Sequence, residues 1–426
     1  MAFIKFKDDY QKGRTIINLC GIKISVINKK LVTRPDYSKA ISKIREKHSR
    51  KEKIKVGFLV SENCKWNAES LYKLLEENEN FEPVVLVTLY TSRHTKQDMT
   101  KTSVEDNYDF FAKQGKRVVK AYDEENEKYL DIKDFDIDVL FYQQPWGIDY
   151  SQSVDVVSQH CLCCYYAYGI TVLDSPIDVR PFHERLYNYF VPNEETAKGL
   201  KKYKINKFDN FSIVGYPKLD IYNNLEKIEH DKKTIIYAPH HSYCRRLRLG
   251  TFPKTGIKML EFAKKHPEYN WIFKPHPDLK EVLYKDKKYG PEFAEKYYEE
   301  WAKVGKVYCK GNYFELFMAS DLLITDCSAF LLEYMPTSNP IIRLDRWDST
   351  KLSDVGKKII KGIYQVYSFK EFESVFKKLE KVEKDELFDK RKEITETILR
   401  KTKNSCANIV KELENLFIVN EEINEK

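Results

Sequence analysis

The sequence predicts an α/β protein built from two parallel-sheet domains, and two observations lead to this prediction. Short apolar runs alternate with amphipathic segments over most of the chain, which is the pattern of βαβ units with buried strands. Three apolar runs in the second half stop at polar loops, as strands do at the ligand-binding edge of an open parallel sheet. A chain of 426 residues is long enough for two hydrophobic cores.

Composition indicates a globular protein and excludes several classes. Hydrophobic residues make up 42% of the chain and charged residues 32%, and no apolar run reaches the roughly 18 residues of a membrane-spanning helix. The start of the chain lacks the apolar segment of a secretory signal, and the 9 cysteines have no disulfide or zinc spacing. We therefore expect a cytoplasmic protein with reduced thiols and no structural metal.

The first half divides into an N-terminal extension and a first domain. Residues 1–50 are charged and weakly periodic, and we expect a partly helical extension packed on the surface. Residues 51–220 are predicted to form a Rossmann-like domain. Its strands are expected at 56–60, 84–89, 137–142, 161–166 and 187–191, with a helix over 67–75. Cys161, Cys163 and Cys164 fall within one of these strands and are expected in the core.

A polar stretch after residues 214–220 marks the boundary of a second Rossmann-like domain, predicted over 221–367. Its strands are expected at 234–238, 271–274, 307–309, 322–325 and 341–344, and its helices at 256–265 and 314–319. The remaining residues, 368–426, are expected to form a helical tail. One apolar stripe at helical spacing lies in this tail and consists of Ile409, Leu413, Leu416 and Phe417.

Three strand ends of the second domain carry polar groups that could meet in one crevice. The segments are 237–243, 274–278 and 325–328, and the carboxyl ends of parallel strands share one edge of a sheet. The histidine pair 240–241 lies in the first segment and His276 in the second. Each has a structural alternative, a loop cap for the pair and a satisfied structural histidine for His276. The coincidence of three such loops favours a functional site.

The third strand end predicts a phosphate site. Ser328 stands where a helix begins, so backbone N–H groups and the positive end of the helix dipole point outward there. An ordinary capped strand-to-helix turn has the same pattern. Glu333 lies about one and a half turns into this helix and could hold ribose hydroxyls. Together these features suit a nucleotide-diphosphate donor.

The chemistry of such a donor assigns roles to the basic residues. Lys274 and His276 are expected to stabilise the charge that develops on a leaving nucleotide. Histidine is also the most suitable general base near neutral pH, and either member of the 240–241 pair could serve. Arg245 and Arg246 could clamp an anionic acceptor or the donor phosphates. The chain has no GxxxxGKS or GxGxxG loop and no Asp-x-Asp motif, which argues against an ATPase, a dehydrogenase and a metal-dependent transferase.

Five segments of the second half resemble the bacterial CDP-glycerol glycerophosphotransferases of teichoic acid and capsule synthesis. They are GYPKLD at 215–220, IYAP at 236–239, FKPHP at 273–277, DLLITDCSA at 321–329 and NPII at 339–342, in matching order and spacing. The resemblance spans about residues 212–345. It implies a GT-B architecture with two facing Rossmann-like domains, the first binding the acceptor and the second the nucleotide donor.

The resemblance also implies residue roles and partners. The equivalents of His276, Thr325 and Ser328 bind the donor diphosphate in that family, with Glu333 toward the ribose. The predicted catalytic residues are His240, His241 and His276, and the predicted donor-binding residues are Lys274, Ser242, Arg245, Thr325, Asp326, Ser328, Ala329 and Glu333. Such enzymes use a nucleotide-activated donor, CDP-linked by this resemblance. They act at the inner face of the cytoplasmic membrane on lipid-linked or polymeric acceptors, with no bound metal or cofactor.

The first half departs from this family at one place. The family carries a Trp-His-Gly-Thr segment whose histidine is the proposed catalytic base, whereas this chain has YYAYG at 165–169, with Tyr168 before the glycine. Residues 240–242, His-His-Ser, also differ from the family's Thr-Trp-Arg. Either the base has moved, to the 240–241 pair or to His183, or the reaction differs. The alternatives are a GT-B sugar transferase with another donor, a nucleotide-sugar epimerase and a non-catalytic scaffold.

Basic residues cluster at 42–55, and the chain has a net charge of +8. Such a run is typical of a solvated surface, but it could also bind an anionic membrane together with the helical tail. No nucleic-acid-binding motif accompanies the charge, so nucleic acid is not an expected partner. Taken with the resemblance, which implies the inner face of the cytoplasmic membrane, this run predicts a cytoplasmic protein that is peripheral on that face.

Overall fold

The chain folds into two compact units in a computed structural model. Unit 1 comprises residues 1–168, 176–220 and 404–426, and unit 2 comprises 169–175 and 221–403. The structure describes residues 4–9, 14–19, 22–28, 33–91, 103–167, 172–174, 181–203, 210–228, 230–243, 248–309, 313–382, 384–400 and 402–418. The chain passes from unit 1 to unit 2 after Asp220 and returns to unit 1 for its last helix.

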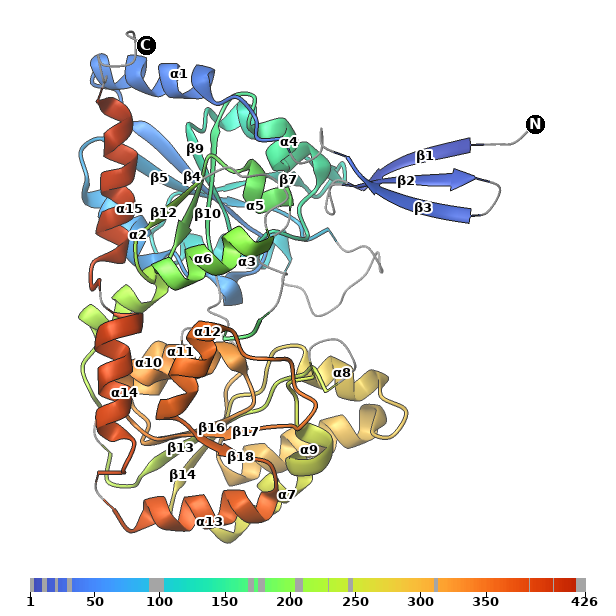
Figure 1. The fold of residues 1–426 in the computed structure, drawn as a ribbon, viewed down its shortest axis with the longest axis vertical. Helices are drawn as coiled ribbons and strands as arrows, with labels where there is room; N and C mark the ends of the chain where they lie inside the picture. The colour runs from blue at the N-terminus through green and yellow to red at the C-terminus, as the bar shows by residue number, and fades with distance from the viewer. Residues whose placement is uncertain are drawn as a thin grey trace. The chain divides into compact units, whose positions relative to one another are not determined.

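The main sheet of unit 1 has seven parallel strands in the order β12-β11-β10-β9-β4-β5-β6 (Figure 1). The strands are β4 Ile54–Val60, β5 Phe81–Val87, β6 Val118–Lys120, β9 Val139–Tyr142, β10 Leu162–Tyr166, β11 Asn188–Val191 and β12 Phe211–Ile213. The helices are α1 Ser38–Ser49, α2 Glu69–Glu77, α3 Val104–Ala112, α4 Val154–Val157, α5 Pro181–Arg185, α6 Glu194–Tyr203 and α15 Ser405–Glu414. A small antiparallel pair, β7 Tyr122–Asp123 and β8 Lys128–Tyr129, completes the unit.

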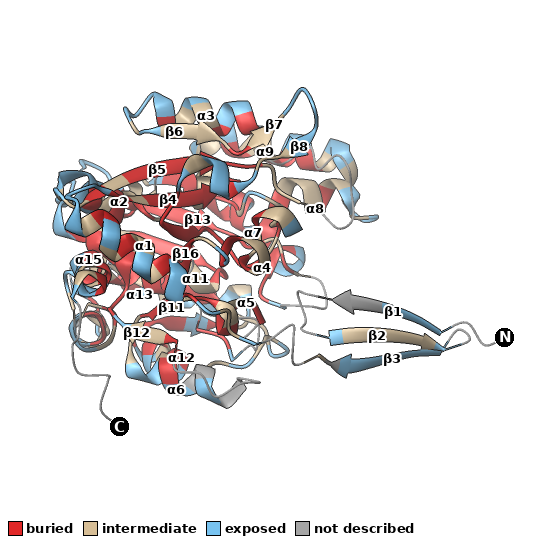
Figure 2. Cartoon of the chain, turned by 90° about the horizontal axis from the view of Figure 1, so that it is seen from above, coloured by how far each residue is buried: buried red, intermediate tan, exposed pale blue. Residues whose placement is uncertain are grey.

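The central strands of unit 1 are buried on both faces (Figure 2). A parallel sheet needs apolar residues at both pleat positions, which explains why these strands read as continuous apolar runs. The core includes Cys161, Cys163 and Cys164, as the sequence predicts. The predicted strands of the first domain correspond to β4, β5, β9, β10 and β11, with ends shifted by a few residues.

The N-terminal extension is partly helical, as predicted, but it also contains strands that the sequence analysis does not predict. Three antiparallel strands, β1 Ile4–Asp9, β2 Arg14–Leu19 and β3 Ile22–Ile27, form a separate sheet before α1. The sequences of β1 and β3 alternate between apolar and polar residues, as in Ile22-Lys-Ile-Ser-Val26. Alternation with a period of two is typical of a strand with one polar face, and the high charge of the segment obscured it.

Helix α1 carries much of the basic run 42–55, and several of its cations are used inside unit 1. Lys43 and Lys47 each form ion pairs of 2.7–2.9 Å with Asp136 and Asp138. Lys47 and Asp138 are both buried. These lysines therefore anchor the helix to the end of the segment that leads into β9, and they do not form a free basic surface.

The sheet of unit 2 has six parallel strands in the order β15-β14-β13-β16-β17-β18. The strands are β13 Thr234–Ala238, β14 Asn270–Phe273, β15 Lys306–Val307, β16 Leu322–Thr325, β17 Ile341–Leu344 and β18 Tyr364–Val366. The helices are α7 Phe252–Lys265, α8 Leu279–Lys285, α9 Gly290–Val304, α10 Phe314–Met318, α11 Ser328–Tyr334, α12 Asp354–Ile359, α13 Phe369–Glu380 and α14 Phe388–Ile394. Helices α7, α9 and α13 lie on one face of this sheet and α10 and α11 on the other (Figure 1). The predicted α/β class and its two parallel sheets are confirmed.

The C-terminal tail is helical and is shared between the units. Helices α13 and α14 belong to unit 2, whereas α15 packs against α2 of unit 1. Ile409, Leu413 and Leu416 are buried in the core of unit 1, so the predicted apolar stripe faces a core. Within the described ranges, the helices all fall short of the length and apolar character needed to cross a bilayer.

Candidate functional site

Polar loops follow three neighbouring strands of unit 2. Strand β13 lies between β14 and β16, and all three run parallel, so their carboxyl ends share one edge of the sheet. Ala238 at the end of β13 pairs with Thr325 at the end of β16, and Tyr237 pairs with Phe273 of β14. The three loops that the sequence singles out therefore start side by side.

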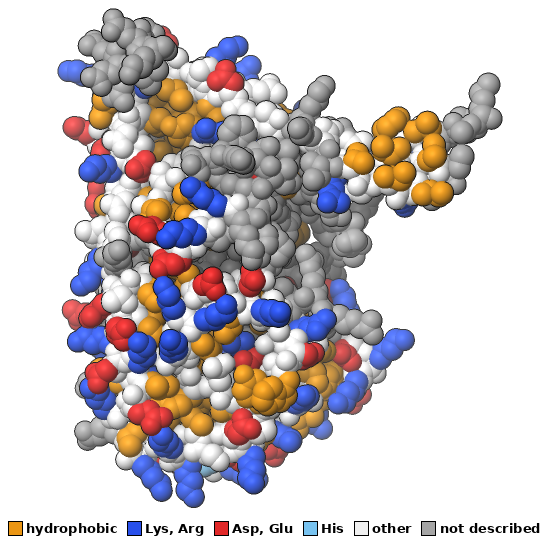
Figure 3. Space-filling model, viewed as in Figure 1, with side chains coloured by type: hydrophobic (Ala, Val, Ile, Leu, Met, Phe, Trp, Pro, Cys, Tyr) orange, Lys and Arg blue, Asp and Glu red, His pale blue; other side chains and the backbone are white. Residues whose placement is uncertain are grey.

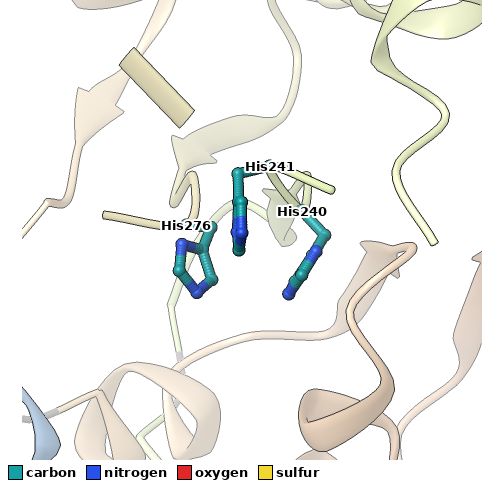
Figure 4. A group of neighbouring side chains, drawn as sticks. All are labelled: His240, His241 and His276. Carbon is teal, nitrogen blue, oxygen red and sulfur yellow. The ribbon is translucent and has the colours of Figure 1, made fainter. Parts of the chain in front are cut away.

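Three histidines from two of these loops lie against one another. The ring centroids of His240 and His241 are 4.4 Å apart, those of His240 and His276 4.7 Å, and those of His241 and His276 4.1 Å. Figure 4 shows the three rings side by side, extending from their loops in the same direction. A backbone bond from His276 N to the carbonyl of Pro239, 2.9 Å long, ties the two loops together. All three predicted catalytic residues thus belong to one cluster.

Backbone N–H groups determine which ring nitrogens carry protons. The backbone N–H of Ser242 donates to Nδ1 of His240, and that of Asp278 donates to Nδ1 of His276, both over 3.1 Å. An N–H group can only donate, so each Nδ1 must present a lone pair. The proton of each neutral imidazole is therefore on Nε2. The cluster offers at least two Nε2–H donors, which suit an anion.

The protonation of His240 follows from its burial. Its side chain is largely buried, and burial together with the neighbouring His241 lowers its pKa to about 3. His240 is thus neutral near pH 7 and donates a neutral N–H. The hydroxyl of Ser242 lies 2.7 Å from the same Nδ1, and this contact further holds the ring in place.

The histidine cluster has the spacing of a metal site but not its hydrogen bonding. The ring nitrogens of the three residues lie within 4.8 Å of one another. A histidine that binds a metal through one nitrogen usually donates its other N–H to an acceptor. His240 and His276 instead accept a hydrogen bond at Nδ1 from a backbone donor. Metal ligation through Nε2 would place a proton on Nδ1 against that donor, so the arrangement fits an anion better than a cation.

The carboxylate of Asp326 holds the loop that follows β13 through hydrogen bonds. Its carboxylate accepts the backbone N–H of His240 over 2.5 Å and both the N–H and the hydroxyl of Thr251, over 2.6 and 2.8 Å. Burial raises the pKa of Asp326 to about 6, against the opposing effect of these hydrogen bonds. Both carboxylate oxygens are used within the protein, so Asp326 positions the loop. A Cβ on Gly250 would lie 2.6 Å from the carbonyl oxygen of His240, and glycine permits this close approach.

The third loop begins a helix as the sequence predicts. Helix α11 starts at Ser328 after its N-cap residue Cys327, whose side chain makes no capping hydrogen bond. The hydroxyl of Thr325 is buried, donates to the carbonyl of Ala238 over 2.6 Å and accepts the N–H of Cys327 over 2.9 Å. Thr325 therefore holds the turn, while Ser328 and Ala329 form the first turn of the helix that follows it.

Lys274 and Glu333, two further predicted donor-site residues, are buried. Lys274 is 6% exposed, and its Nζ lies 4.7 Å from the ring centre of Tyr313 and 5.0 Å from that of Phe330. Glu333 is 0% exposed and accepts a hydrogen bond from the hydroxyl of Tyr313. The ammonium and the carboxylate are thus connected through one tyrosine. Stacking of a cation on aromatic rings stabilises its buried charge.

Several predicted residues lie elsewhere or outside the described residues. Arg245, Arg246 and Tyr168 are not among the described residues. His183 is in α5 of unit 1, is 5% exposed and contacts the rings of Tyr165, Phe182 and Tyr189. This aromatic packing favours a structural role for His183 over that of a general base.

Sequence reasoning missed the residues that support the loops. Thr251 binds Asp326, Tyr313 binds Glu333, and Arg346 donates from Nη1 to the carbonyls of Tyr243 and Gly250, both over 3.1 Å. None of these residues lies in a motif, although Arg346 follows the end of β17 by two positions and Thr251 and Tyr313 precede helices α7 and α10. Only their partners, which lie far away in the chain, reveal their part in the site.

Comparison with known proteins gives one family and a set of similar folds. The family model described as CDP-Glycerol:Poly(glycerophosphate) glycerophosphotransferase matches residues 176–394, more than half of the chain. No curated protein matches the chain.

Similar solved structures include epimerases and a polymerase. A putative UDP-N-acetylglucosamine 2-epimerase from Listeria monocytogenes has a TM-score of 0.54 at 14% identity, covering 86% of this chain and 96% of that chain. The UDP-GlcNAc 2-epimerase of Neisseria meningitidis bound to UDP-GlcNAc has a TM-score of 0.52 at 14% identity, covering 85% and 100%. A variant of the wall teichoic acid polymerase TagF soaked with CDPG has a TM-score of 0.53 at 13% identity, covering 89% and 93%. At these identities the similarity establishes the GT-B type of fold.

Proposed function

Because the chain belongs to the CDP-glycerol:poly(glycerophosphate) glycerophosphotransferase family, we propose that it transfers glycerol phosphate from CDP-glycerol to a cell-surface polymer. The polymer is of the teichoic acid or capsule type. The observation that carries this proposal is the coincidence of the family match with the histidine cluster, since the matched residues include all three strand-end loops. The chain is thus a transferase.

The reaction requires stabilisation of negative charge on the donor diphosphate. An acceptor hydroxyl attacks the phosphorus that carries glycerol, the bond from this phosphorus to the bridging oxygen breaks, and CMP leaves. We assign the Nε2–H groups of His240 and His276 to the diphosphate oxygens, together with the first-turn N–H groups of α11. Neutral donors held by backbone contacts need no reorganisation as the charge develops.

The proton of the acceptor hydroxyl must pass to a base. In their neutral forms, His240 and His276 carry the Nε2 proton and cannot accept another at that atom. His241, whose ring contacts both, is the base that we propose in this cluster. Ser242, Asp326, Thr325 and Lys274 then act as supporting residues of the donor site, with Ser328, Ala329 and Glu333 along α11.

No metal is required in this proposal. The hydrogen bonds that the backbone makes to Nδ1 of His240 and His276 favour anion binding, and N–H donors would meet the phosphate charge directly. We further propose that the acceptor is lipid-linked or polymeric and that the enzyme works as a peripheral protein at the inner face of the cytoplasmic membrane.

The nucleotide-sugar epimerases share this fold and define the competing hypothesis. Epimerisation would alter a UDP-sugar without any acceptor, whereas transfer consumes CDP-glycerol only when an acceptor is present. Their identity of 14% supports the common fold alone. The family match therefore favours the transferase.

A donor and acceptor matrix tests the proposed function. The purified full chain is incubated with CDP-glycerol or UDP-N-acetylglucosamine, with and without a short glycerol phosphate polymer, and CMP, UDP and epimerised sugar are measured. CMP release that depends on both CDP-glycerol and the polymer is expected. Epimerised sugar in the absence of acceptor, or a complete lack of turnover and of CDP-glycerol binding, would contradict the proposal.

A further inference from the structure

The N-terminal sheet β1–β3 exposes an unusual number of large apolar side chains. Six of the 14 exposed large hydrophobic residues in the described part of the chain belong to it. They are Ile4, Phe6, Leu19, Ile22, Ile24 and Val26, with exposures that reach 69% for Phe6 and 66% for Ile22. The other eight are distributed over both units, from Leu74 to Ile418, as is normal for a protein surface.

The strand register places these six residues on one face. Ile4 pairs with Leu19, and Leu19 with Ile22, while Phe6 and Ile24 both pair with Ile17. Residues directly opposite each other in antiparallel strands point to the same side of the sheet. Val26 is two positions from Ile24 and shares its face. Hydrophobic side chains gather over these strands in Figure 3.

The opposite face is polar and basic apart from Ile16. Lys5, Asn18 and Lys23 pair across the three strands, and Ser25 pairs with Ile16. Lys5, Arg14 and Lys23 are all exposed. The sheet is therefore amphipathic, with a cationic side behind an apolar side. This is the composition of elements that lie in the interface of an anionic bilayer.

The size of the apolar face argues against a second copy of the chain as its partner. Three strands of six residues, at strand spacings of about 4.8 Å and rises of about 3.3 Å, present a face of about 290 Å². Two such faces packed together would bury about 600 Å², whereas a stable protein interface needs about 1,200 Å² or more. A bilayer has no such minimum, because lipid surrounds each inserted side chain and anionic headgroups attract the cations.

We propose that the apolar face of β1–β3 is a membrane-docking surface that inserts into the headgroup region of an anionic bilayer. The proposal rests on the proposed function in one respect, since a lipid-linked acceptor would place the reaction at a bilayer. The apolar face of β1–β3 takes the place of the basic run 42–55 as the predicted membrane contact, because Lys43 and Lys47 are held in ion pairs within unit 1. The N-terminal strands then bring the transferase to its acceptor.

Two neighbouring substitutions on β3 test the surface. Ile24→Asp places a carboxylate on the apolar face, and the matched control Ser25→Asp places the same charge on the polar face of the same strand. The full chain is floated with vesicles of equal parts phosphatidylglycerol and phosphatidylcholine. We expect the wild type to float, Ile24→Asp to partition at least ~10-fold less and Ser25→Asp less than ~5-fold less.

Further measurements keep the test decisive. Phe6→Ser removes apolar area without adding charge and should also weaken flotation. This second variant tests the same surface even if Ile24→Asp disturbs the folding of the sheet. The proposal is overturned if the wild type does not float, or if Ile24→Asp and Ser25→Asp lose binding equally. It is also overturned if sedimentation shows a wild-type dimer that Ile24→Asp converts to a monomer.

One assay distinguishes failure of the transferase proposal from failure of the membrane-docking proposal. With a short water-soluble glycerol phosphate acceptor, Ile24→Asp should release CMP from CDP-glycerol at the wild-type rate, because the substitution lies outside the donor site. If the wild type releases no CMP with any acceptor, yet floats while Ile24→Asp does not, the transferase proposal fails and the docking surface stands.

Discussion

At the carboxyl edges of the two parallel sheets, backbone N–H groups donate to side chains in both units, but the acceptor side chains serve different ends. In unit 1, the side chain of Gln143 satisfies the backbone, since it accepts the N–H groups of Ser61 and Glu62 and donates to the carbonyl of Glu62. In unit 2, the backbone orients side chains, since N–H groups fix the imidazoles of His240 and His276. Gln143 thus satisfies the backbone at the sheet edge of unit 1, whereas the histidines of unit 2 are oriented to donate to a ligand.

This difference agrees with the distribution of family features along the chain. The five motif segments and the strand-end loops belong to unit 2, apart from residues 215–220 at the boundary. Of the segment 165–169, which departs from the resemblance, residues 165–168 belong to unit 1. One architecture thus serves two purposes. The amide of Gln143 in unit 1 uses its own N–H within the protein, whereas the imidazoles of His240 and His276 in unit 2 offer an Nε2–H to a ligand.

The largest expected effect is on activity in unit 2. His276→Ala removes one phosphate donor, and loss of a preorganised donor of this kind lowers turnover by about 10²–10³-fold. The measurement is CMP release from CDP-glycerol, compared with His230→Ala, which replaces an exposed histidine of the same unit. Wild-type activity in His276→Ala would contradict the proposal that the sheet edge of unit 2, unlike that of unit 1, binds the donor.

A smaller effect, on stability alone, is expected in unit 1. Gln143→Ala leaves the buried N–H groups of Ser61 and Glu62 without their acceptor, which should cost about 2–3 kcal/mol of unfolding free energy. The free energy is measured by urea denaturation, with the exposed Gln114→Ala as the control. Turnover per folded molecule should stay near the wild-type value. A large loss of turnover with intact stability would show that unit 1 also has a functional edge.

The smallest expected effect is the pH dependence that His240 contributes. Its pKa is lowered from an ordinary 6.5 to about 3 by burial and by His241, so the unfolded chain takes up the proton first as the pH falls. The stability that this group contributes is present above pH 6.5 and is lost progressively toward pH 3. At pH 5 the loss amounts to about 2 kcal/mol.

The comparison with His240→Asn isolates this contribution. Asparagine keeps an acceptor for the N–H of Ser242 but has no proton to gain. The wild type should therefore lose stability relative to His240→Asn between pH 7 and pH 5 in urea denaturation. Asp326, whose pKa is raised to about 6 by burial, is present in both proteins and contributes to the comparison only as a common background. A pH-independent difference would contradict the neutral state of the ring.

Sequence reasoning succeeded where local pattern and sheet topology determine the outcome. The strands 234–238, 322–325 and 341–344 were predicted with their observed bounds, because each is an apolar run between polar turns. The meeting of the three histidines followed from the rule that parallel strands end at one edge. The strands β1–β3 were missed, because residues 1–50 were interpreted as charged and weakly periodic.

By itself, the sequence determined the α/β class, the loops that carry the site, and the family of the chain. Only the tertiary structure decided what each side chain does there. It made Asp326 and Thr325 supports of the turn, and it buried Glu333 and joined it through Tyr313 to Lys274. It also turned the backbone donors toward the imidazoles. These roles depend on contacts such as that between His240 and Asp326, 86 residues apart, and such contacts exist only once the strands have paired.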